Sequence, residues 1–433
     1  MNRILERWGK TPAPRVRKWW MAHHVKLLRL AIVLMVILAF LKLGLGFQRL
    51  LWESGWTGAN DLKSRHREVQ AWFSGMPVYG VIKSAVYPPA SYPILWPFLG
   101  WTGIASARWL WAVASLVALG WLSFLILRES GAETLRECVL IVVMFLSMNA
   151  TCVVLGTGQL ILLVMPMLIT GLLLLRRGLR SWREGLLAVV LTLVPLVSPT
   201  ISAPFFWMVL FVPRTRKPAL GVVLGYIALT LLAASFQNVE PISLLRQWIE
   251  RGQAGAVRGS LGASGNLHSQ LASFNLQRWN LPLSLFLLAS LGFWTHRYRR
   301  GDFWTLLGVT ALVARFWTYH RTYDNLLILL PAVALFRIAK RGPSPDGWDV
   351  MAALLLVTTC IFMMIPNRLL LFWPPWGPLL VTGQSVWAPW DPLFKTGQFV
   401  TWMIDLVFLL IWAEKVRKEK TGDRAWRKYR IAP

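Results

Sequence analysis

The chain has 433 residues, of which 56% are hydrophobic and 15% are charged. With a mean hydropathy of +0.51, this composition is typical of a multi-pass membrane protein and excludes a soluble globular domain. The formal net charge of +27 would indicate nucleic-acid binding in a soluble protein, but here the Lys and Arg residues lie in short segments between apolar runs, as in membrane proteins that contact anionic lipid. We therefore expect one all-α integral membrane domain over residues 1–433, with membrane lipid around it and no nucleic-acid partner.

The first apolar run, residues 30–47, follows a basic N-terminal segment. Residues 1–29 are rich in Arg and Lys, so we expect them to stay in the cytoplasm while the run crosses the membrane outward. No small-residue cleavage site follows the run, which indicates an uncleaved first span. Lys42 lies within this span, and we expect its long side chain to reach the interface. Residues 48–108 then form the first external loop.

The first external loop contains a predicted amphipathic helix and a broken apolar segment. Residues 61–72 place apolar side chains near one face and charged ones on the other, which predicts a helix lying along the membrane surface. The apolar positions are Leu62, Val69 and Trp72, and the water-facing ones are Lys63, Arg65, Arg67 and Glu68. Residues 90–103 are apolar, short and interrupted by two prolines. If they crossed the membrane, the later basic loops would fall outside, so we expect a re-entrant segment.

The rest of the chain alternates apolar runs with short basic loops. Residues 186–212 carry no charge and are broken at 198–200, which predicts two short helices that meet on the external side. The other runs occupy residues 109–127, 139–155, 160–175, 220–236, 281–295, 303–314, 326–336, 350–365 and 399–412. Together these runs predict about 12 transmembrane helices and two cytoplasmic termini, the second being the basic tail at 413–433. Residues 237–280, 315–324 and 367–398 then lie outside.

Several common chemistries have no signature in this sequence. There is no GxxxxGK[ST] phosphate loop, no HExxH motif and no paired-cysteine set, which disfavours ATP-driven and zinc-dependent functions. Cys138, Cys152 and Cys360 fall in apolar runs without metal or disulfide spacing. We also expect no acidic residue deep inside a span, which disfavours ion-coupled transport. No cofactor or metal is therefore expected, and the remaining polar residues gather at the external face.

Asp61 is the first candidate catalytic residue. An ionised carboxylate at the membrane surface is able to accept the proton of an alcohol while the alcohol oxygen attacks. Because Asp61 precedes a helical run, a helix N-cap is the alternative interpretation. Glu68 lies two helical turns further along a similar face, where its position predicts a solvated carboxylate.

Two more polar segments border apolar runs. The segment RFWTYHRTYD at 315–324 gathers four charged or titratable side chains among aromatic ones: Arg315, His320, Arg321 and Asp324. Charge-assisted hydrogen bonds from Arg and His would hold a lipid phosphate there, whereas an interfacial aromatic belt with charged anchors is the alternative. Residues 156–159 contain two glycines and predict a tight turn, but a turn gives no reason for the presence of Gln159.

The order of these motifs resembles the polyprenyl-phosphate-sugar-dependent glycosyltransferases of family 87, membrane enzymes of GT-C architecture. The first matching element is an Asp followed by ExxxWxxGxPVY and YPP, here Asp61, Glu68, Trp72, Gly75, Pro77, Tyr79, Tyr87, Pro88 and Pro89. Three weaker elements follow in the family's order: Gly158 with Gln159, a GNxxS-like element at Gly265, Asn266 and Ser269, and a YDxxLLLLP-like segment at 323–331. Ser198 stands where the family usually has the Lys of a Lys-Pro pair.

The resemblance implies a GT-C-like bundle that transfers a hexose, typically mannose, from a polyprenyl-phosphate donor to a lipid or glycan hydroxyl at the external, periplasmic face of the cell membrane. Asp61 is the implied base of a direct inverting displacement, with Arg278, Arg315 or His320 stabilising the phosphate charge. The expected substrate contacts are Glu68, Tyr87, Gln159, Asn266, His268, Arg278, Arg315, His320 and Asp324. A transporter or flippase of lipid-linked glycans is the alternative, and a scaffold role leaves the clustered polar residues unexplained.

Overall fold

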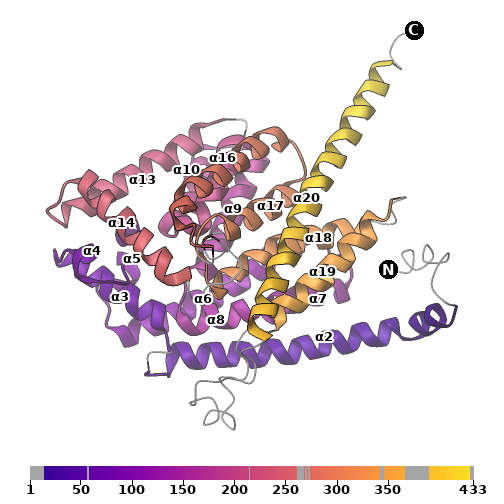
Figure 1. Cartoon of the computed structure of the whole chain (residues 1–433), viewed down its shortest axis with the longest axis horizontal. Helices are drawn as coiled ribbons and strands as arrows, with labels where there is room; N and C mark the ends of the chain where they lie inside the picture. Colours follow the sequence, from indigo (N-terminus) through magenta and orange to yellow (C-terminus); the bar gives the residue numbers. More distant parts are fainter. Residues whose placement is uncertain are drawn as a thin grey trace.

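The computed structural model describes residues 14–55, 58–213, 215–260, 268, 271, 274–341, 346–365 and 390–429. All regular structure in these ranges is helical, which confirms the predicted all-α class. The longest described helices are α2 (Pro14–Leu51) and α20 (Trp390–Tyr429). Helix α2 runs along one side of the bundle, and α20 leaves the bundle toward the C-terminus (Figure 1).

Four described helices are long and apolar enough to cross a membrane. They are Leu28–Leu51 within α2, α6 (Ile104–Ser130), α13 (Lys217–Ser235), and Thr322–Lys340, which joins η5 (Thr322–Ile328) to α18 (Leu329–Lys340). Two bent pairs raise the number to six: α7 (Leu135–Leu146) with α8 (Asn149–Thr157), bent by 48°, and Trp182–Val197 with Pro199–Phe211, bent by 119°. These helices are those of a membrane protein, while the predicted count of about 12 is not confirmed.

The second bent pair confirms that residues 186–212 form two helices rather than one. Pro195, Pro199 and Pro204 supply no backbone N–H donor around the break, so a continuous helix is not favoured there. The pair consists of α10 (Trp182–Leu193), η2 (Val194–Val197), α11 (Pro199–Ser202), η3 (Ala203–Phe205) and α12 (Phe206–Phe211). The segment expected to re-enter contains α5 (Ser91–Leu99), whose nine residues span about 14 Å. That length is well short of a hydrocarbon core of about 30 Å.

The remaining described elements complete a bundle around α18. They are α3 (Asn60–Phe73), α4 (Val78–Val81), α9 (Ile161–Arg177), α14 (Pro241–Ser260), η4 (Gln277–Trp279), α16 (Asn280–Tyr298), α17 (Phe303–Phe316) and α19 (Trp348–Met364). Helix α18 is buried along nearly all its length and packs against α6, α17 and α19. Helix α2 instead exposes large apolar side chains such as Phe40, as expected for a surface that faces lipid.

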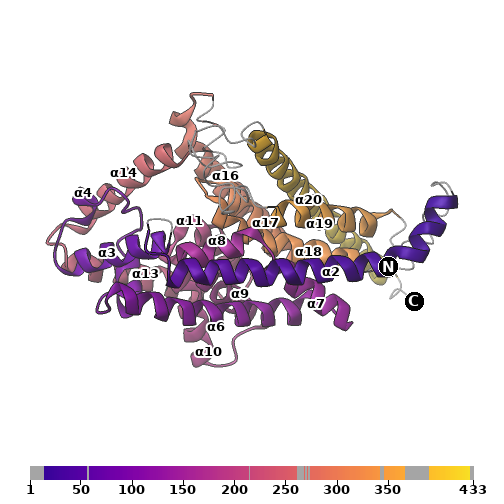
Figure 2. The ribbon, with the colours of Figure 1, turned by 90° about the horizontal axis from the view of Figure 1, so that it is seen from below.

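The bundle has two polar ends, separated by the length of α6. Its 27 residues correspond to about 40 Å. At its start, Arg108 donates hydrogen bonds to the carbonyl oxygens of Leu51 and Glu53, beside α3. At its end, Glu129 accepts a hydrogen bond from Arg177 at 3.0 Å. We call the end beside Arg108 the Asp61 end; α3, α4 and α14 lie together there in both views (Figures 1 and 2). We call the opposite end, beside Glu129 and Arg177, the basic end.

Lys42 does not reach the interface, so the prediction for its side chain is wrong. The residue is only 7% exposed, and its Nζ donates hydrogen bonds of 2.7 Å to the carbonyl oxygens of Ser147 and of Met364. Ser147 lies at the break between α7 and α8, and Met364 is the last residue of α19. An ammonium inside a span is tolerated when such partners solvate it, and Lys42 thereby joins three helices.

Asp405 in α20 overturns the expectation that no acidic residue lies deep inside a span. Its side chain is fully buried within the run predicted to cross at 399–412, and its Oδ2 accepts a hydrogen bond of 2.7 Å from the Thr359 hydroxyl of α19. The hydroxyl supplies part of the solvation that hydrocarbon does not. The bundle therefore contains a carboxyl group between α19 and α20.

Candidate active site

Asp61 lies inside helix α3, because another residue occupies the N-cap position of this helix. The N-cap is Ala59, in a left-handed conformation with φ of 50°, and no side chain caps the helix. The Ala59 N–H donates a hydrogen bond of 2.9 Å to the Gly156 carbonyl oxygen, which fixes the start of α3 against the end of α8. The N-cap interpretation of Asp61 is therefore wrong, and its carboxylate lies in the first turn of α3.

The turn at residues 156–159 brings Gln159 to Asp61. Gly158 ends α8 with φ of +71°, a conformation that favours glycine. The Gln159 side chain then forms a hydrogen bond with the Asp61 carboxylate. The Thr157 side chain is a further hydrogen-bond partner of the same carboxylate, and its hydroxyl also lies 2.8 Å from the Val153 carbonyl oxygen. The hydrogen bond with Asp61 gives a reason for the presence of Gln159, which the turn alone did not give.

Replacement of Gly158 tests this arrangement. A Cβ at this position would lie 2.7 Å from the Leu62 Cβ of α3, and a positive φ adds a penalty of its own for alanine. We expect Gly158→Ala to destabilise the protein by about 2 kcal/mol, measured by thermal unfolding in detergent. Gly178→Ala is the matched control, because Gly178 also has a positive φ, of +86°, but no atom within 4 Å of its Cβ position. Equal losses would show that the contact with Leu62 is unimportant.

The Asp61 carboxylate is largely removed from water but lies among cations. Burial raises the pKa of Asp61 above its usual value, while Arg65, the Gln159 hydrogen bond and Arg321 oppose that rise. A carboxylate in such surroundings is a stronger base than one in water, because its charged form is less well solvated. Asp61 is thus equipped to take a proton from a bound hydroxyl group.

Glu68 and Arg65 form a buried ion pair, so the prediction that both face water is wrong. Glu68 has no exposed surface, and its Oε2 lies 2.5 Å from Nη1 of Arg65. The Ser84 hydroxyl donates to the other carboxylate oxygen at 3.1 Å, and the Arg65 guanidinium lies 4.3 Å from the centre of the Tyr87 ring. The spacing of three residues places both charges on the face of α3 that packs inward. Glu68 therefore holds Arg65 in place near Asp61.

The third part of the site is the segment before and within η5. His320 Nδ1 lies 3.1 Å from Asp324 Oδ2, and the Arg321 backbone N–H donates to the same oxygen at 3.0 Å. His320 and Asp324 are only 1% and 5% exposed. Charged anchors of an interfacial aromatic belt would be exposed, so these two residues do not fit that alternative. The Arg321 side chain is exposed, donates through Nε to the Tyr319 hydroxyl at 2.5 Å and acts on Asp61 electrostatically. The sequence analysis named Arg321 only as a member of this segment, and its signal there is its place between His320 and Asp324.

Burial favours the neutral form of two histidines near this segment, His268 and His320. Burial lowers the pKa of His320, although Asp324 opposes the change. Burial also lowers the pKa of His268 to about 4, and the nearby His320 adds to the effect. His268 Nε2 lies 2.9 Å from the Ser284 hydroxyl oxygen. At neutral pH, both rings therefore act as hydrogen-bonding groups rather than as cations that would bind a phosphate.

The other predicted site residues are distributed differently. Tyr87 lies on Arg65, and Asp61 and Asp324 both raise the pKa of its hydroxyl after burial, which is the main cause. Arg315 is 1% exposed and donates to the Asn325 side chain at 2.9 Å, behind the segment. Arg278 is exposed on η4, and the structure describes no contact between it and Asp61. Asn266, with Gly265 and Ser269, lies outside the described residues.

Asp61 lines neither of two pockets found in the described part of the chain. One, of about 340 Å³, is lined by Tyr79, Gly80, Gln247, Glu250 and Arg251 at the Asp61 end. The other, of about 240 Å³, lies at the basic end. Within the described residues, no group of three or more His, Cys, Asp or Glu side chains is placed to hold a metal ion. The site is therefore a set of charged and polar side chains from α3, the turn after α8 and the segment leading into η5.

Comparison with models of known protein families assigns the chain to a family. A family model described as glycosyltransferase family 87 matches residues 85–366, more than half of the sequence. The match includes Tyr87, Gln159 and the segment 319–324, whereas Asp61 and Glu68 precede it. Comparisons with curated proteins and with solved structures each gave no match. The match to the family model, on a bundle of membrane-spanning helices, shows that the chain belongs to glycosyltransferase family 87 and is a membrane glycosyltransferase.

Proposed function

We propose that the enzyme transfers a hexose, most simply mannose, from a polyprenyl-phosphate donor to a hydroxyl group of a lipid or glycan acceptor. The observation that carries this proposal is the convergence of Asp61, Gln159 and Arg321, which come from three distant segments. It supports a site in which a base, a group that orients the base and an exposed guanidinium act together. A displacement at a sugar carbon that bears a phosphate needs these three functions.

In the proposed reaction, the acceptor oxygen attacks the anomeric carbon while Asp61 takes the hydroxyl proton. The new bond between the acceptor oxygen and the anomeric carbon forms as the bond from that carbon to the phosphate oxygen breaks. The products are the glycoside, with inverted configuration, and polyprenyl phosphate. Arg321 stabilises the charge that develops on the leaving phosphate, and Gln159 holds the Asp61 carboxylate toward the acceptor. No general acid is required, because a phosphate leaves as an anion.

The charge distribution supports an orientation for this site. The basic end carries Arg177, Arg337 and Lys340 in ion pairs with Glu129, Asp302 and Glu137, together with exposed arginines on the loops that follow α9 and α16. Under the positive-inside rule this end faces the cytoplasm. Asp61 then lies on the external face, where the prenyl chain of the donor would reach it laterally from the outer leaflet.

Donor use by the purified full-length chain in proteoliposomes tests the proposed function. We expect polyprenyl-phosphate-[14C]mannose to be consumed in the presence of acceptor lipid extract, with release of polyprenyl phosphate, and a nucleotide-linked mannose to be left unchanged. The glycosidic product should carry the anomeric configuration opposite to that of the donor. Transfer from the nucleotide sugar, or retention of configuration, would contradict the proposal.

One observation favours the alternative function of a flippase: Asp405 places a buried carboxyl group between α19 and α20. Transport pathways commonly use such buried ionisable groups. The same proteoliposomes distinguish the two functions. A flippase moves a fluorescent polyprenyl-phosphate sugar between leaflets without breaking its glycosidic bond. We expect bond cleavage in the wild type and in Asp405→Asn, whereas leaflet exchange without cleavage would favour transport.

The raised pKa of Asp61 predicts a pH dependence. The base has to be ionised, so activity should fall as the pH falls through the pKa of the folded enzyme. Since burial places that pKa above the usual value of about 4, kcat/KM should begin to fall at a pH clearly above 4. A profile measured with the lipid-linked donor between about pH 4 and pH 8 checks this. An acidic limb at or below pH 4 would show that Asp61 is not perturbed or is not the base.

Arg321 gives a second kinetic prediction. Arg321→Gln removes a charge-assisted contact to the leaving phosphate, so kcat/KM for the donor should fall about 30-fold. Arg67→Gln is the matched control, because Arg67 is an exposed arginine on α3, at the same end of the bundle. The control should stay within about twofold of wild type. Equal losses in both variants would indicate general surface electrostatics rather than a phosphate contact.

A further inference from the structure

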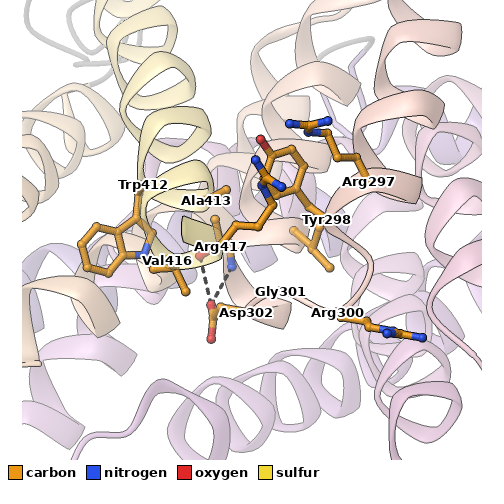
Figure 3. A pocket seen from close by; sticks show the side chains of 11 residues that line it. Arg297, Tyr298, Arg300, Gly301, Asp302, Trp412, Ala413, Val416 and Arg417 are labelled. Carbon is orange, nitrogen blue, oxygen red and sulfur yellow. Dashed lines mark hydrogen bonds between the residues drawn. The ribbon is translucent and has the colours of Figure 1, made fainter. Parts of the chain in front are cut away.

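A pocket of about 240 Å³ opens at the basic end, between the end of α16, the start of α17 and α20 (Figure 3). Its walls include the aromatic rings of Tyr298 and Trp412, and its charged residues are Arg297, Arg300, Arg417 and Asp302. In Figure 3 the Arg297 and Arg417 side chains lie at the Tyr298 ring, and Trp412 lies on the opposite side. The pocket is far from Asp61 along the bundle and takes no part in the proposed reaction.

The charges of this pocket do not balance. The Asp302 carboxylate accepts hydrogen bonds from the Thr305 N–H and hydroxyl and lies 3.5 Å from Arg341. Arg417 lies 2.6 Å from Glu414. Arg297 and Arg300 are exposed and form no ion pair with any part of the chain that the structure describes. The pocket therefore carries an excess of positive charge, which favours an anionic ligand.

Trp412 adds a hydrogen-bond donor to the pocket wall. The residue is only 7% exposed, and its Nε1–H has no hydrogen-bond partner within the described residues. A buried N–H without an acceptor is costly, and most such groups in folded proteins are paired. An anionic oxygen in the pocket would supply the acceptor, because the Trp412 side chain is part of the pocket wall.

The surface next to the pocket is apolar and exposed. Phe293 is 72% exposed and lies one helical turn before Arg297, on the same face of α16. On α20, Val407 and Ile411 are 49% and 51% exposed, one turn apart, just before Trp412. A ligand that joins an anionic group to long hydrocarbon chains would contact the arginines with its head and these side chains with its tails. A free anion would use only the arginines.

We propose that this pocket binds the phosphate headgroup of an anionic membrane lipid, with the acyl chains of the lipid along α16 and α20. The site takes a phosphodiester at the membrane surface opposite to the catalytic one. It holds the end of α16 and the end of the membrane-spanning part of α20 to one lipid molecule. The proposal does not depend on which sugar or acceptor the enzyme uses.

Native mass spectrometry of the full-length chain in a neutral detergent tests this proposal, with phosphatidylglycerol as the probe. Arg297→Gln/Arg300→Gln should weaken phosphatidylglycerol binding about 30-fold, because each guanidinium at a lipid surface contributes about fivefold. Arg180→Gln/Arg299→Gln is the matched control, since it removes two exposed arginines from the same end that do not line the pocket. The control should bind within about twofold of wild type.

Two further arms identify the ligand. Phosphatidylcholine should bind weakly to all three proteins, and inorganic phosphate at millimolar concentration should leave phosphatidylglycerol bound. Phosphatidylglycerol should also raise the Tm of the wild type and the control but not that of the pocket variant. Equal weakening in both double variants, equal binding of phosphatidylcholine, or displacement by inorganic phosphate would each overturn the proposal. Equal glycosyl transfer by all three proteins would show that they are folded.

Discussion

Asp61→Asn should reduce transfer from the lipid-linked donor by about 10²- to 10⁴-fold, the usual contribution of a positioned general base. The asparagine keeps the size of the side chain and its hydrogen bond with Gln159 but accepts no proton at neutral pH. The effect should appear in kcat and in kcat/KM alike, because proton removal occurs in the transition state. Turnover of polyprenyl-phosphate-[14C]mannose in proteoliposomes measures it.

Thermal stability separates loss of the base from loss of the fold. The pKa of Asp61 is raised in the folded state, so the ionised carboxylate opposes folding at any pH above that pKa. Removal of the charge should therefore leave Tm at pH 7 unchanged or higher. Glu240→Gln, at an exposed carboxylate beside the start of α14, is the control for activity and should turn over like wild type. An inserted, stable Asp61→Asn enzyme with wild-type turnover would remove Asp61 from the mechanism.

Glu68→Ala should destabilise the folded protein by about 3–5 kcal/mol, because it leaves the Arg65 guanidinium buried without its counter-charge. The Glu68 carboxylate has no exposed surface and lies 2.5 Å from Arg65, so water does not replace it. Activity should fall as well, since Arg65 would no longer be held near Asp61. Unfolding by SDS titration, followed by circular dichroism, measures the loss of stability.

A double-mutant cycle assigns that loss to the pair. Arg65→Met/Glu68→Ala should be less destabilised than the sum of the two single variants, because neither charge remains buried alone. Glu133→Ala provides the surface comparison: its side chain is 82% exposed and lies 3.5 Å from Lys340, and its effect should stay within about 0.5 kcal/mol. Additive losses at Arg65 and Glu68 would mean that the two side chains contribute independently.

Local patterns predicted those parts of the molecule that local physics determines. Apolar runs and their prolines predicted the helical class, the break near Ser198 and the short segment around α5, because backbone hydrogen bonding and proline geometry act over a few residues. The two glycines at 156–158 predicted a turn for the same reason. Asp61 was predicted to be a candidate catalytic residue because carboxylates beside an apolar run are uncommon.

Local sequence patterns did not predict contacts between residues that are far apart in the chain. Arg65 and Lys42 are charged, and sequence alone assigns a charged side chain to water or to the interface. Each also has partners far from its own helix turn: the Tyr87 ring for Arg65, whose ion pair with Glu68 lies within α3, and the carbonyl groups of Ser147 and Met364 for Lys42. Gln159 and Arg321 belong to the site through contacts across nearly 100 residues or more, and no periodicity encodes such contacts.

Lys42 also has a consequence for how the chain is made. Its helix leaves the ribosome before its partners do, because the carbonyl groups that solvate its ammonium belong to residues 105 and 322 positions further along. Until those later helices arrive, the nascent first helix carries a charge that the bilayer interior does not solvate. Completion of synthesis would therefore be coupled to the final seating of α2, and a chain truncated before α19 would be recognisable to membrane quality control by that one lysine.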